Sequence, residues 1–142
     1  MAISSNDCGR EYRPDVPYLV TREKITEFVA AIGEEHPQFL ATEPIAPPTF
    51  AMVIAGVAWQ KMFADENLGL QLARTVHADQ VFNYQRPIRV GDEILPVLRI
   101  ENVRHRAGAD WIQISVTLHT VAGEQVCETK TTLLHTREVT NA

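Results

Sequence analysis

The sequence predicts an α+β fold in which an antiparallel sheet wraps around one long buried helix. Residues 49–63 carry no charged residue before Lys61. A segment that is apolar on every side is enclosed by other structure, and this one is longer than a usual buried strand. Apolar and polar side chains alternate at 111–121 and 124–136, as expected for strands. Because such a sheet must cover its apolar face, we expect the helix to provide that cover.

The N-terminal part of the chain predicts an extended arm followed by an amphipathic helix. Residues 11–20 contain two prolines, which favours an arm or an edge strand because proline cannot donate to a sheet. Thr21 is suited to cap the helix that follows, and Gly33 stands where that helix should stop. The apolar residues between them have helical spacing and are Ile25, Phe28, Val29 and Ile32. One face of this helix should therefore pack against the rest of the protein.

The connection to the buried helix is predicted to be mostly loop. Residues 37–48 contain four prolines, and most of these cannot lie inside a regular element. Pro47 and Pro48 fit at the first turn of the buried helix, where a missing N–H group costs little.

Four strands are predicted after the buried helix, at 76–88, 93–103, 111–121 and 124–136. His77 and Asp79 are two residues apart on the first of them, so both side chains should lie on one face. A metal site needs more ligands than this pair, and we find no third ligand at a useful spacing. We therefore expect neither a metal nor a cofactor.

Composition and charge exclude several classes of function. A net charge of −5 argues against a nucleic-acid partner, and we interpret the cluster Arg104, His105 and Arg106 as the solvated end of a hairpin. The sequence has no run of 18 apolar residues, and its start lacks the pattern of a signal peptide. Cys8 and Cys127 are interpreted as free thiols, which fits a protein of the reducing cytoplasm.

Two motifs resemble the hot-dog-fold MaoC-like dehydratases. These are IAPPTF at 45–50 and the pattern H-x-x-Q-x-F-x-Y-x-R-P-x-x-x-G-D at 77–92. They are most similar to a small actinobacterial subgroup that includes subunits of (3R)-hydroxyacyl-ACP dehydratases, and the resemblance extends over about 9–136. It implies one hot-dog domain over 1–142 and at least a dimer. It also implies a ligand that is an acyl thioester on CoA or on acyl carrier protein.

The start of the buried helix is the expected site for the thioester oxygen. Dehydration of a 3-hydroxyacyl thioester removes a proton from C2, which requires stabilisation of negative charge on that oxygen. Backbone N–H groups at a helix N-terminus can provide it. Since proline has no N–H, the donors would be those of Thr49, Phe50 or Ala51. The alternative for Thr49 is that it only caps its own helix.

The acid and base of the family are only partly present in this sequence. Catalytic members end the first helix with a motif like G-D-x-N-P-x-H, whereas this chain has GEEHPQF at 33–39. Glu34 stands where the resemblance places the aspartate, and Phe39 stands where it places the histidine. His36 lies three positions before the place of the missing histidine and is a candidate to replace it. We expect His36 instead to interact with the C-terminal end of the first helix. The resemblance therefore implies a site without its proton carrier.

Three functions remain open. The first is an acyl-thioester-binding, non-catalytic subunit of a (3R)-hydroxyacyl-CoA or -ACP dehydratase in fatty-acid metabolism, as a heterodimer with a catalytic MaoC-like subunit. The second is a self-sufficient homodimeric hydratase or thioesterase in which Glu34 activates water, with His36 as a further candidate. The third is a non-enzymatic module that binds acyl-CoA.

Overall fold

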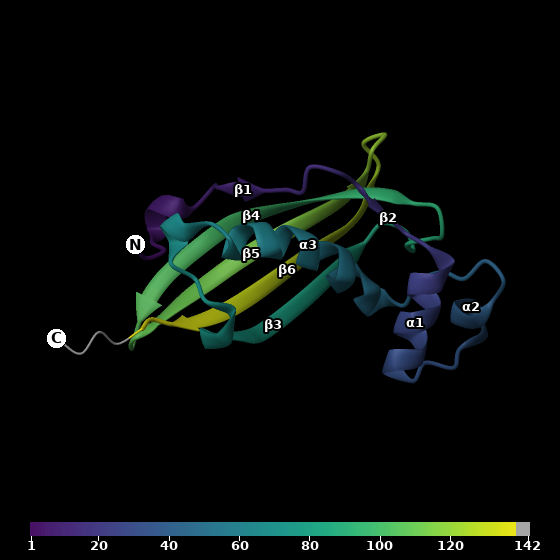
Figure 1. The fold of residues 1–142 in the computed structure, drawn as a ribbon, viewed down its shortest axis with the longest axis horizontal. Coiled ribbons are helices and arrows are strands. Elements are labelled where there is room, and N and C mark those ends of the chain that lie inside the picture. Colours follow the sequence, from purple (N-terminus) through teal and green to yellow (C-terminus); the bar gives the residue numbers. More distant parts are fainter. Residues whose placement is uncertain (139–142) are drawn as a thin grey trace.

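Four strands of the C-terminal half and two short strands of the N-terminal arm build a six-stranded antiparallel sheet that curls around one helix (Figure 1). The computed structural model describes residues 1–138. The strands are β1 (Glu11–Tyr12), β2 (Tyr18–Leu19), β3 (Thr75–Tyr84), β4 (Glu93–Arg106), β5 (Ala109–Thr120) and β6 (Gln125–Thr136). The helices are α1 (Arg22–Ile32), α2 (Pro37–Leu40) and α3 (Ala51–Phe63). The strand order is β1-β4-β5-β6-β3, and β2 also pairs with β4. The predicted fold class is therefore confirmed.

The arm and the first helix agree with the sequence prediction. Both short strands of the arm pair with β4, so the arm extends the sheet at this edge. At the start of α1, the Thr21 hydroxyl accepts a hydrogen bond from the N–H of Lys24 at 3.2 Å. At its end, Gly33 has a φ of 68°, a left-handed conformation that glycine adopts without steric cost. The helix buries Ile25 and Val29.

Helix α3 lies along the concave side of the sheet and forms the centre of the core (Figure 1). It follows a 3-10 turn at Pro48–Phe50, so both prolines lie just before the helix. Its fully buried side chains are Ala51, Ile54, Ala55, Ala58 and Met62. The opposite flank, made of Val53, Gly56 and Val57, is only half-buried. The predicted buried helix is therefore covered by the chain's own sheet on one side, and this flank is the part that the sheet leaves half-buried.

The register of the sheet decides which side chains face α3. On β5 the predicted inward set, Ile112, Ile114, Val116 and Leu118, is buried as expected. On β3 an irregularity lies between His77, opposite Leu133, and Asp79, opposite Thr132. Because those two partners are neighbours on β6, the side chains of His77 and Asp79 lie on opposite faces. The prediction that they share one face is wrong, since the extra residue in β3 changes the alternation.

Candidate active site

The segment GEEHPQF forms a tight turn between α1 and α2. The N–H of Glu34 donates to the Val29 carbonyl at 3.1 Å, which closes the end of α1. One oxygen of the half-buried Glu34 carboxylate accepts hydrogen bonds from the N–H groups of Glu35 and His36, each at 3.0 Å. The Glu34 carboxylate therefore holds the backbone of the turn.

His36 is exposed and caps α2. Its Nδ1 accepts a hydrogen bond from the N–H of Gln38 at 3.3 Å, which places it at the N-terminus of that helix. The expectation that His36 interacts with the C-terminal end of α1 is wrong, because the chain starts a new helix at Pro37. The same short helix replaces part of the predicted loop. A neutral His36 that accepts at Nδ1 carries its proton on Nε2.

Phe39 is 8 % exposed and belongs to the hydrophobic core. It forms part of the wall of a groove of about 350 Å³ between α2 and the end of β3. The other lining residues are Gln38, Ile45, Ala46, Pro48, Tyr84, Gln85, Arg86 and Pro87. Among the six site residues predicted from the sequence, Phe39 is the one that lines this groove within the described chain.

The start of α3 meets this groove at Pro48. Thr49 is exposed, whereas the side chains of Phe50 and Ala51 are fully buried. The N–H of Phe50 donates to the Pro47 carbonyl at 2.9 Å, and the N–H of Ala51 is directed at the Thr49 carbonyl. Of the three expected donors to a thioester oxygen, the N–H of Phe50 is therefore engaged within its own turn.

Tyr84 connects the edge strand to this helix start, which the sequence analysis did not predict. Its hydroxyl donates a hydrogen bond to the Pro48 carbonyl. Burial is the main cause that raises the pKa of Tyr84 above the ordinary tyrosine range, so the hydroxyl keeps its proton. The available sequence signal was the position of Tyr84 inside the motif at 77–92. That signal gave no indication of its partner.

Arg86 lies at the groove with its charge balanced. Its guanidinium bonds both oxygens of Asp92, at 2.9 and 3.0 Å, and its Nε bonds Glu124 at 2.6 Å. The hydrogen bonds with Asp92 are the main cause that raises the pKa of Arg86. The groove is therefore walled by aromatic, aliphatic and proline side chains and the amides of Gln38 and Gln85, beside a neutralised cation, and this suits an uncharged chain better than an anion.

No three histidine, cysteine or carboxylate side chains converge as a metal site within residues 1–138. In the same part of the chain, no helix has the length and apolar character needed to cross a membrane.

The curled sheet, the central helix and the proline-rich turn that starts this helix define a hot-dog protein of the MaoC-like dehydratase class. The chain belongs to the family described as FAS1-like, dehydratase domain region, whose model matches residues 6–129. It is 48 % identical over 142 residues to a UPF0336 protein of Cutibacterium acnes, which covers all of both chains.

Two solved structures of this class are similar to the chain. One is a C-terminally truncated HadBC complex, a (3R)-hydroxyacyl-ACP dehydratase of Mycobacterium tuberculosis. Its TM-score is 0.81 at 28 % identity, over 93 % of this chain and 99 % of that one. The other is a MaoC-like dehydratase with a TM-score of 0.82 at 30 % identity. This match covers 92 % of the present chain and 42 % of the longer one.

Proposed function

We propose that this chain is the non-catalytic, acyl-thioester-binding subunit of a (3R)-hydroxyacyl-CoA or -ACP dehydratase in fatty-acid metabolism. The observation that carries the proposal is Phe39. It stands where the resemblance places the catalytic histidine, its ring can neither take nor give a proton, and it is packed into the core.

The neighbouring groups support this proposal because they already have local partners. The Glu34 carboxylate accepts hydrogen bonds from two backbone N–H groups, and His36 caps α2. The N–H group of Phe50 is engaged in the turn that starts α3. A partner chain would supply the acid, the base and the donors to the thioester oxygen, while this chain would contribute the apolar groove for the acyl group.

Two surfaces support pairing with a second chain. Strand β3 is the last strand of the sheet order and exposes Val76 (60 %) and Val81 (44 %). An exposed strand edge of this kind can pair with another chain. The half-buried flank of α3 would be covered by the same partner. The similar HadBC structure is itself a complex.

The test is hydration of crotonyl-CoA by the purified chain alone, measured as loss of the enoyl absorbance, with thiol release measured in parallel. We expect no turnover above background. We also expect turnover when the MaoC-like chain that copurifies from the native host is added. Turnover by the chain alone that is lost in Glu34→Gln or His36→Ala would instead establish the self-sufficient hydratase or thioesterase. Purification from the host without any MaoC-like partner would also count against a subunit role.

A further inference from the structure

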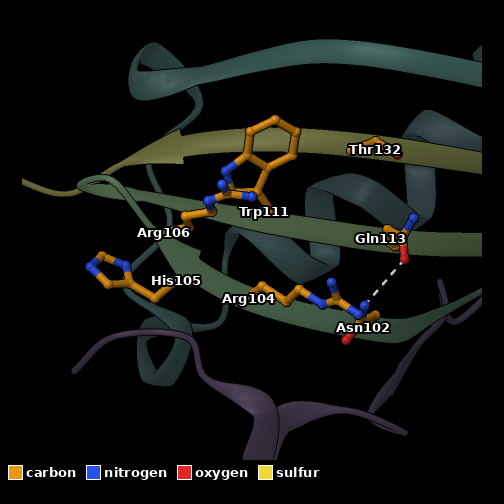
Figure 2. A pocket seen from close by; sticks show the side chains of 7 residues that line it. All are labelled: Asn102, Arg104, His105, Arg106, Trp111, Gln113 and Thr132. Carbon is orange, nitrogen blue, oxygen red and sulfur yellow. Dashed lines mark hydrogen bonds between the residues drawn. The ribbon is translucent and has the colours of Figure 1, made fainter.

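A second concave surface lies on the face of the sheet opposite α3. It has a volume of about 650 Å³ and is formed by side chains of β4, β5 and β6 (Figure 2). Arg104 lies opposite Trp111 in the β4–β5 pairing. Gln113 lies opposite Asn102 on one side and Thr132 on the other. Since Ile112 and Ile114 face the core, their neighbours Trp111 and Gln113 must face away from it. We call this surface the outer groove; its lining residues are Asn102, Arg104, His105, Arg106, Trp111, Gln113 and Thr132.

The outer groove itself carries two arginines, and the adjoining pocket, which shares Gln113 and Thr132 with it, carries the carboxylates of Asp79, Glu101 and Glu128. None of its lining residues is a carboxylate, although the chain has a net charge of −5. Arg86, Arg99 and Arg137 each pair with a carboxylate elsewhere. Within residues 1–138, no such pair forms at Arg104 or Arg106. Two guanidinium groups that alternate on one strand are thus available for an anion, and guanidinium matches phosphate oxygens in bidentate geometry.

Trp111 gives the same groove a flat aromatic surface. Its side chain stands beside Arg106 (Figure 2), and the residue is 44 % exposed. An exposed indole offers a face on which a planar base can stack. Next to it, the Asn102 side-chain amide donates to the Gln113 carbonyl at 3.3 Å. That bond leaves the Asn102 carbonyl and the Gln113 amino group as one acceptor and one donor for the edge of a base.

A network centred on the buried carboxylate of Asp110 fixes the hairpin that carries both arginines. Asp110 is 1 % exposed and accepts hydrogen bonds from Arg137 at 2.8 and 3.1 Å. It also bonds His105 at 2.9 Å and His135 at 3.4 Å. His105 is anchored between Arg104 and Arg106, so the strand under the two arginines is held in place. A groove that is ordered in advance loses less entropy when it binds a ligand.

We propose that the outer groove binds an adenine nucleotide, with the purine stacked on Trp111 and the phosphates bonded to Arg104 and Arg106. Its volume falls within the range of small-molecule sites. Nucleic acid fits less well, because the positive charge is confined to one hairpin and a polynucleotide needs a longer basic surface. The site lies on the opposite face of the sheet from the acyl groove at the start of α3, so it stands or falls independently of the proposed subunit function.

ADP is the probe, and tryptophan fluorescence and calorimetry are the measurements. The chain has two tryptophans, and Trp111→Phe identifies which one responds. We expect saturable quenching by ADP that disappears in Trp111→Phe, together with binding that weakens as salt is raised. Adenosine and pyrophosphate, which each lack one half of the ligand, should bind at least about tenfold more weakly.

Charge-removing variants locate the site. Arg104→Gln and Arg106→Gln should each weaken ADP binding about tenfold, since each removes a charge-assisted bond to phosphate. Arg99→Gln is the matched control, because it removes the same charge from the same strand outside the groove, and it should leave binding unchanged. The proposal is overturned if ADP does not saturate or if pyrophosphate binds as well as ADP. It is equally overturned if both groove variants bind normally, or if a single-stranded oligonucleotide binds far more tightly than ADP.

Discussion

Replacing Asp110 with asparagine should remove a large part of the stability of the β4–β5 hairpin end. The carboxylate is almost completely buried and joins Arg137, His105 and His135. His135 in turn accepts the N–H of Gln71 at 3.1 Å, so the network also ties the loop before β3 to the sheet. Asp110→Asn keeps the shape of the side chain but loses the negative charge and one acceptor oxygen.

The magnitude follows from the kind of bonds that are lost. A hydrogen bond to a charged group contributes about 1.5–3 kcal/mol. Breaking a fully buried ion pair costs about 3–5 kcal/mol. Arg137 is partly exposed, so solvent screens its share of the interaction. We therefore expect a loss of about 2–3 kcal/mol, which for a chain of 142 residues corresponds to a fall in Tm of about 7–10 °C.

The effect should also depend on pH in a defined direction. Burial opposes ionisation of Asp110, but the bonds from Arg137, His105 and His135 outweigh it and hold its pKa below the ordinary value. A carboxyl group whose folded pKa is lowered contributes stability above its unfolded pKa of about 3.9, and loses that contribution as pH falls through the folded pKa. The difference in unfolding free energy between wild type and Asp110→Asn should therefore have its full value at neutral pH and become smaller below about pH 4.

Urea unfolding at fixed protein concentration, at several pH values, measures this difference. Asp15→Asn is the control, because it removes the same charge from an exposed side chain. The Asp15 carboxylate makes one exposed ion pair, at 3.8 Å from the Lys61 ammonium group. This control should change stability by no more than about 0.5 kcal/mol. The charge-based account of the network would be refuted if Asp110→Asn lost as little unfolding free energy as the control. It would also be refuted if the loss of unfolding free energy stayed constant as the pH is lowered into the acidic range.

Three further outcomes are expected. Phe50→Ala should lower the free energy of unfolding by about 3–5 kcal/mol, measured with a chemical denaturant, because Phe50 is fully buried. Val76→Ala, at an exposed position, should change it by no more than about 0.5 kcal/mol. Equal losses of unfolding free energy in the two variants would contradict the assigned core. Gly69→Ala should lower Tm by more than an alanine substitution at an exposed surface position does. The φ of Gly69 is +62°, and the new Cβ would lie 2.0 Å from a backbone oxygen. In a thiol-reagent assay of the native protein, the exposed Cys8 should react quickly. Cys127 should react only after unfolding, because it is buried and burial raises its pKa to about 11. If both thiols react quickly in the native protein, this expectation is wrong.

Most of the fold was predictable because its signals are local. Alternation with a period of two located β5 and β6 within a few residues, and Thr21 and Gly33 marked both ends of α1. The irregularity between His77 and Asp79 was not predictable, because it is defined by the pairing with β6. An apolar pattern also does not tell whether a helix is covered by its own sheet or by another chain. The open flank of α3 therefore could not be predicted.

The candidate sites divide in the same way. The replacement of the expected histidine by Phe39 was visible in the sequence, because it depends on position alone. The bond from Tyr84 to Pro48 was not visible, since these residues lie 36 positions apart. In the outer groove, the period of two places Arg104 and Arg106 on one face, but only the register of the sheet places Trp111 opposite Arg104.

Under the proposed subunit role, the half-buried flank of α3 would have a consequence for the supply of this protein in the cell. A copy that is synthesised without a companion leaves Val53, Gly56 and Val57 open to chaperones and proteases. A copy that is joined to a companion hides them. Turnover by quality control would then remove whichever copies are in excess, so the amount of this chain would follow the amount of its companion even if the two genes were expressed at different rates.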